Sequence, residues 1–138
     1  MNNENFTEKV SVNINTSTLS SIDLLVDNGY YSNRSDFINQ ALREGLQKHQ
    51  NTIDRIIDKK TEFKEVSPNQ WFIGVYGIDK HDVERARRQG REININGYGV
   101  LVIDKDIDEE TLYEVVRTIK VKGRVVCNKN IKEHYGLK

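Results

Sequence analysis

A short alternating segment near the start of the chain constrains the fold more than any other feature. Val10, Val12 and Ile14 alternate with polar residues, which is the pattern of a β-strand with one buried face. Two amphipathic segments with helical periodicity follow directly. A lone strand with two helices cannot close a core by itself. We therefore expect two chains to pair these strands into a ribbon.

The two helices following this strand have clear start and stop signals. Asn15 or Thr16 is expected to cap the first helix, and Gly29 suits a left-handed exit from it. The second helix is expected to begin at Asn33, with Asp36 completing an Asn version of the capping box. The apolar stripes expected to be buried contain Leu19, Ile22, Leu25 and Val26 in the first helix and Phe37, Ile38, Ala41, Leu42 and Leu46 in the second.

The start of the second helix has two interpretations. The free backbone amides of Arg34 and Ser35 lie at the positive end of the helix, where a phosphate oxygen would be favoured. The same Asn-Arg-Ser-Asp run also makes a good helix cap without any ligand. Local sequence leaves both interpretations open.

The turn between the helices carries a specific pattern, Gly-x-Tyr-Ser-x-Arg-Ser-[Asp/Glu]-Phe-Ile. It is formed here by Gly29, Tyr31, Ser32, Arg34, Ser35, Asp36, Phe37 and Ile38. Together with the preceding strand, this segment resembles the ribbon-helix-helix family, the superfamily of the Arc, MetJ and CopG repressors, in its CopG-like branch. The resemblance covers residues 8–47, less than a third of the chain, and strand, turn and helix agree in order and spacing.

The resemblance implies an intertwined homodimer, or a dimer of dimers, with an antiparallel ribbon in the major groove of double-stranded DNA. By position, the bases would be contacted by Lys9, Ser11 and Asn13. The DNA backbone would be contacted by Asn33, Arg34 and Ser35. Lysine can donate to guanine and asparagine can pair with adenine, although family members often carry arginine where Lys9 stands. The alternative for the three strand residues is a solvated edge strand.

The charge balance gives little general attraction to DNA. The formal net charge of the 138 residues is zero. Residues 1–50 contain four basic residues, Lys9, Arg34, Arg43 and Lys48, against six acidic ones, Glu4, Glu8, Asp23, Asp27, Asp36 and Glu44. Charge-driven, non-specific binding should therefore be weak, and a few well-placed contacts would have to supply specific binding.

The composition changes beyond Pro68, the only proline. We expect a ribbon-helix-helix domain at residues 1–48, a helical linker at 49–70 and a small α/β domain for oligomerisation or effector binding at 71–138. An aliphatic-x-aliphatic-x-Gly pattern occurs at 73–77, 93–97 and 119–123, with helix-like segments at 81–89 and 109–119. This favours stacked strand–helix repeats in a mostly parallel sheet. A compact βαβ-type sensor domain is the alternative, and the fold class is α+β in either case.

Residues typical of catalysis or metal binding are scattered. His49, His81 and His134 lie far apart, and the lone Cys127 is expected to be a packed strand residue. The acidic residues at 104–110 are expected to cap a helix. The sequence therefore predicts no enzyme activity, no metal and no cofactor. It contains no apolar run of membrane-spanning length, and we expect a cytoplasmic protein.

These patterns favour a dimeric, sequence-specific DNA-binding transcriptional regulator, expected to be a repressor. One alternative is the antitoxin of a toxin–antitoxin pair, because many antitoxins use this N-terminal fold. Another is a dimerisation or assembly module without a DNA function, which the low charge favours. The operator, the regulated genes and any small-molecule effector are not encoded in a recognisable motif.

Overall fold

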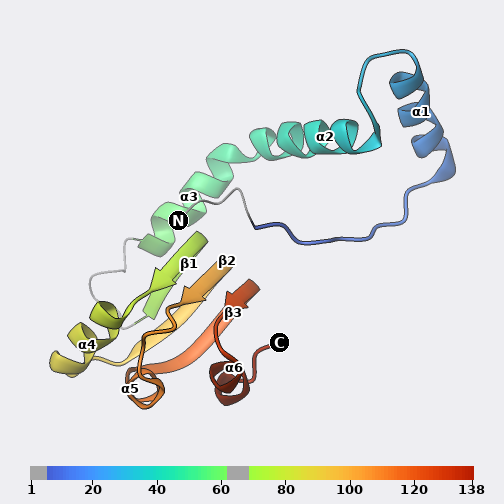
Figure 1. Ribbon diagram of the computed structural model, residues 1–138. Helices are drawn as coiled ribbons and strands as arrows, with labels where there is room; N and C mark the ends of the chain where they lie inside the picture. Colours follow the sequence, from blue (N-terminus) through green and yellow to red (C-terminus); the bar gives the residue numbers. More distant parts are fainter. Residues whose placement is uncertain (1–5, 62–68) are drawn as a thin grey trace. The chain divides into compact units, whose positions relative to one another are not determined.

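The computed structural model describes residues 6–61 and 69–138 and divides the chain into two compact units (Figure 1). One unit is Glu8–Asp58, and the other includes Lys59–Lys138. The boundary expected at Pro68 lies outside the described residues.

The first unit is helical. It contains α1 (Thr16–Asp27), α2 (Arg34–Lys48) and most of α3 (Gln50–Thr61). The Asn15 side chain accepts a hydrogen bond from the Ser17 amide at 2.8 Å and so caps α1. Gly29 follows α1 with φ 82°, which confirms the expected left-handed exit.

The strand expected at residues 9–14 is absent from the single chain. Residues 6–15 have no regular secondary structure, and Val10 and Val12 are 77% and 70% exposed. A strand exists only where its backbone N–H and C=O groups pair with a neighbouring strand. Residues 9–14 have no such neighbour within the described part of one chain, so only their alternation marks them as a strand.

The apolar stripes of the two helices differ in their burial. Ile22 of α1 is buried, as expected. On α2, Phe37 is half-buried and packs edge-to-face against Tyr31, with 4.9 Å between ring centroids. The expectation of burial was wrong for the rest of the α2 stripe in the single chain, where the exposed residues are Ile38, Ala41, Leu42 and Leu46. α1 covers only one side of α2, so a single chain leaves this stripe in solvent.

The second unit is a three-stranded parallel sheet in the order β1-β2-β3, with a helix after each strand (Figure 1). The elements are β1 (Asn69–Ile78), α4 (Lys80–Arg88), β2 (Ile93–Ile103), α5 (Glu109–Val115), β3 (Val116–Val126) and α6 (Lys129–Tyr135). The expected parallel sheet with helices between its strands is thus present, and this arrangement agrees both with stacked strand–helix repeats and with a compact βαβ-type domain. The helix expected to reach Ile119 is shorter, because β3 begins at Val116 and Ile119 pairs with Ile95.

The register of the sheet does not follow the repeated sequence pattern. The repeated pattern would align Gly77, Gly97 and Gly123, whereas the strands align Gly74, Gly99 and Gly123. All three aligned glycines have positive φ, of 100°, 126° and 142°. A Cβ at Gly99 would collide with the carbonyl oxygen of Gly74, and a Cβ at Gly123 would collide with that of Gly99. Only glycine permits this close stacking of backbones.

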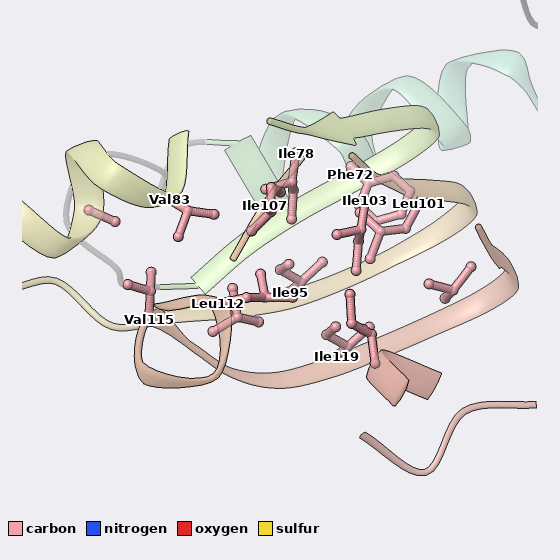
Figure 2. Packing of buried hydrophobic residues seen from close by; sticks show 14 residues of the cluster. Phe72, Ile78, Val83, Ile95, Leu101, Ile103, Ile107, Leu112, Val115 and Ile119 are labelled. Carbon is pink, nitrogen blue, oxygen red and sulfur yellow. The ribbon is translucent and has the colours of Figure 1, made fainter. Parts of the chain in front are cut away.

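The core lies between the sheet and its helices (Figure 2). Ile95 and Leu101 of β2 and Leu112 of α5 are fully buried. The Tyr135 hydroxyl donates to the Val116 carbonyl oxygen at 2.6 Å, and burial raises the pKa of this phenol. Cys127 packs beside the core directly after β3, and burial also raises the pKa of its thiol. A raised pKa disfavours the thiolate that nucleophilic chemistry requires.

Each helix of this unit begins at a side-chain cap. Asp79 and Asp82 form a reciprocal capping box at α4. Asp108 accepts from the Thr111 amide at α5, as expected for the acidic segment, and Asn128 accepts from the Ile131 amide at α6. Every strand therefore ends close to a residue that starts the next helix.

The glycine stacking yields a matched pair of substitutions. Gly99→Ala introduces both an unfavourable φ and a backbone collision, whereas Gly74→Ala introduces the φ alone, because its Cβ would meet open space. We expect Gly74→Ala to lower the free energy of unfolding by about 1–3 kcal/mol. Gly99→Ala should lower it by a further ~2 kcal/mol or more. The free energy of unfolding of both variants can be measured by urea unfolding monitored through the fluorescence of Trp71. An equal loss in the two variants would contradict the close contact between Gly99 and the Gly74 carbonyl.

Candidate nucleic-acid interface

The three residues expected to contact bases lie in the segment before α1. The side chains of Lys9, Ser11 and Asn13 are all exposed. They alternate with Val10 and Val12, which are also exposed. Within the described part of the chain, none of the three polar side chains forms a hydrogen bond or ion pair, so they are available to a ligand.

The three residues expected to contact the DNA backbone lie together at the start of α2. The Asn33 side chain caps the helix by accepting from the Asp36 amide at 2.8 Å. The Asp36 carboxylate in turn accepts from the amide of Ser32 at 2.9 Å, one residue earlier than in the expected capping box. The amides of Arg34 and Ser35 have no acceptor among residues 6–61 and 69–138. These two donors therefore face outward at the positive end of the helix.

Arg34 is held by a partner that sequence reasoning missed. Its Nε lies 2.8 Å from Asp23 Oδ1, and its Nη2 lies 2.9 Å from Asp23 Oδ2. This bidentate pair joins α2 to α1 and holds the pKa of the Asp23 carboxyl below its usual range, chiefly through the hydrogen bond from Arg34. No local pattern in the sequence relates two residues on different helices, so no signal could have identified the pair.

The ion pair leaves part of the guanidinium free. Arginine has five N–H donors in a planar fork, and Asp23 engages Nε and one N–H of Nη2. The remaining donors can contact a phosphate oxygen while Asp23 fixes the plane of the group. The pair also compensates the charge of Arg34, so the guanidinium presents directed N–H donors with little net positive charge.

The two groups of candidate residues are separate in their hydrogen bonding. Asn33, Arg34 and Ser35 form one cluster, and no hydrogen bond or ion pair links that cluster to Lys9, Ser11 or Asn13 among the described residues.

Within residues 6–61 and 69–138, no group of three or more His, Cys, Asp or Glu side chains is arranged to hold a metal ion. In the same residues, no helix combines the length and the apolar character needed to cross a membrane.

Comparison with known proteins extends the resemblance beyond the N-terminal segment. Residues 5–132 match the ribbon-helix-helix transcriptional regulator family, so the match runs through both structural units. No curated protein and no solved structure gives a significant match. Because the family match covers nearly the whole length, the chain belongs to the ribbon-helix-helix transcriptional regulator family.

Proposed function

We propose that the protein is a sequence-specific DNA-binding repressor in which two chains pair residues 9–14 into an antiparallel ribbon. Membership in a family of transcriptional regulators supports the regulatory role. The observation that carries the proposal is the exposed segment itself, in which Val10 and Val12 alternate along the sequence with Lys9, Ser11 and Asn13. In the ribbon, the polar side enters the major groove and the apolar side covers the two chains' helices.

The exposed stripe of α2 provides the surface that such a ribbon and a second chain would cover. Leu42 and Leu46 are each 59% exposed, and Ile38 lies on the same stripe. Burying a large aliphatic side chain contributes about 1.5–3 kcal/mol each. In a dimer, each chain would bury Ile38, Leu42 and Leu46 together with Val10 and Val12. The free energy of this apolar burial would then stabilise the ordered ribbon.

The start of α2 supports the proposed grip on the DNA backbone. Two outward amides, at Arg34 and Ser35, and the free guanidinium donors of Arg34 suit phosphate oxygens. Because residues 1–50 carry more acidic than basic groups, these contacts position the protein rather than attract it from a distance. Selection of a site then depends on Lys9, Ser11 and Asn13.

Dimerisation can be tested on the exposed stripe. Leu42→Asp places a charge where the second chain would pack, and we expect the protein to sediment as a monomer in analytical ultracentrifugation. Asn39→Asp is the matched control, because Asn39 is an exposed polar residue of the same helix. A Leu42→Asp protein that remains dimeric through its N-terminal unit would contradict the proposed pairing.

DNA recognition can be tested by selecting genomic fragments at ~0.15 M salt. We expect one enriched sequence with two-fold symmetry. Asn13→Ala should relax the preference at one base pair per half-site, at a cost of about 1–3 kcal/mol. Arg34→Ala should weaken every site by a similar factor, because phosphate contacts carry no sequence information. Failure to enrich any sequence would contradict the repressor proposal and favour an assembly module without a DNA function.

The Asp23–Arg34 pair predicts a pH dependence. A carboxyl whose pKa is lower in the folded state stabilises that state above the pKa of the unfolded chain, and the contribution is lost as pH falls through the folded pKa. A ¹³C NMR titration should place the Asp23 midpoint below the ordinary 3.8 in the wild type and return it upward in Arg34→Ala. The stability difference between wild type and Asp23→Asn should shrink over the same acidic range. An Asp23 midpoint unchanged by Arg34→Ala would show that the pair does not persist in solution.

A further inference from the structure

Among the described residues, the parallel sheet of the second unit has one face covered by helices and one open face. The helices α4, α5 and α6 lie along one side of it, and Phe72, Leu101 and Ile119 point into that core (Figures 1 and 2). The alternate residues point the other way, and several of them are exposed. We call this second side the open face, defined by Trp71 and Ile73 of β1, Asn96 and Tyr98 of β2, and Lys120, Lys122 and Arg124 of β3. Parallel sheets are usually covered on both faces, so an open one indicates a binding surface.

All charged side chains of the open face are positive. The register aligns Trp71 with Asn96 and Lys120, and then Ile73 with Tyr98 and Lys122. Arg124 follows on the same side of β3, and no acidic residue occupies these rows. Successive cations on β3 are about 6.6 Å apart along the strand. Among the described residues none of these three cations forms a salt bridge, in contrast to Arg87 and Arg117, which pair with Glu114 and Glu92.

Aromatic and amide groups adjoin this row of cations. Tyr98 is 54% exposed, and its ring meets Trp71 edge-to-face with 6.5 Å between centroids. Ile73 beside it is 52% exposed. On β2, Asn94 accepts from the Thr118 hydroxyl at 2.9 Å, which leaves its amide N–H donors free for a ligand. The face therefore combines flat rings, hydrogen-bond donors and a positive edge.

We propose that the open face is a second nucleic-acid-binding surface that holds a single strand. The phosphates follow Lys120, Lys122 and Arg124, and the unpaired bases stack on Tyr98 and Trp71. Stacking on aromatic side chains beside a positive groove is the general chemistry by which single strands bind. Duplex DNA hides its base faces in the stack, so a flat sheet cannot offer it this contact.

The charge pattern also argues against a second copy of the chain as the occupant. Two open faces brought together would bury six cations with no acidic partner on either side, which is strongly unfavourable. Asp79 and Asp104 lie just beyond the carboxyl ends of β1 and β2, where they line a hollow of about 520 Å³. Neither carboxylate belongs to the rows of the open face, so the strip of cations keeps its positive charge.

The test uses the full-length protein and labelled single strands of about 12 nucleotides, one oligothymidine and one oligouridine. Binding is followed by fluorescence anisotropy and by the emission of Trp71, the only tryptophan, which reports directly on the open face. We expect saturable binding with quenching of Trp71. A preference for oligouridine would identify RNA as the ligand, and equal or better binding of oligothymidine would identify single-stranded DNA. Either result supports the proposal.

The variants separate stacking from charge. Tyr98→Ala should weaken binding roughly 5- to 150-fold, as loss of one base–aromatic stack does. Tyr98→Leu keeps apolar volume at this position but removes the aromatic ring, so it should also weaken binding. It replaces the alanine variant in the test if that variant is unstable. The double change Lys120→Gln with Lys122→Gln should reduce the slope of log affinity against log salt by about 1.4. The matched control is Arg85→Gln with Arg88→Gln on α4, which removes two exposed cations from the covered side of the sheet.

Several outcomes would overturn the proposal. They are an unchanged Trp71 emission, an equal loss of affinity in the α4 control, or equal binding of a duplex of the same length with the same quenching. Self-association that is lost on mutating Lys120 and Lys122 would also overturn it, because the open face would then join copies of the chain. Asn13→Ala should leave single-strand binding intact, so a failure of the repressor proposal is distinguishable from a failure of this one.

Discussion

The contact between glycine backbones across the sheet determines most of the second unit. Because Gly99 approaches the Gly74 carbonyl and Gly123 approaches that of Gly99, the three strands have one register. A shift by one residue would move every side chain to the opposite face. The same register buries Leu101 and Val125 and exposes Tyr98 and Lys122. Core and open face therefore follow from a single steric constraint.

A different constraint governs the first unit. Residues 9–14 can form a β-strand only if a second strand pairs with them. The helices of the first unit have complete caps at Asn15 and Asn33 and a bidentate tie between Asp23 and Arg34. Its apolar residues, by contrast, are largely uncovered. The helices and their caps are thus fully formed in one chain, whereas many of the apolar side chains remain exposed. This division explains how each helix can be well formed before the proposed ribbon exists.

Local signals predicted local structure well. The caps at Asn15 and Asn33, the exit at Gly29 and the parallel strand–helix order depend on neighbouring residues or on simple periodicity. The sheet register could not be predicted, because Gly77 and Gly97 fit the repeated pattern as well as Gly123, and only the stacked backbones distinguish Gly74 and Gly99. The partner of Arg34 and the open face were not predictable, since both depend on residues that only the folded chain brings together. The DNA-contacting roles of Lys9, Ser11 and Asn13, and of the start of α2, remain predictions.

The order of the sheet has a consequence for how the second unit folds. Each strand pairs only with the strand of the adjacent repeat, and each following helix starts from its own cap at Asp79, Asp108 or Asn128. Such a unit behaves as a short one-dimensional array, whose stability is a sum of repeats and of the interfaces between them. The central strand β2 has two interfaces, while β1 and β3 have one each. We therefore expect opening to begin at the outer repeats, and β2 with its Leu101 to be the last element to lose protection.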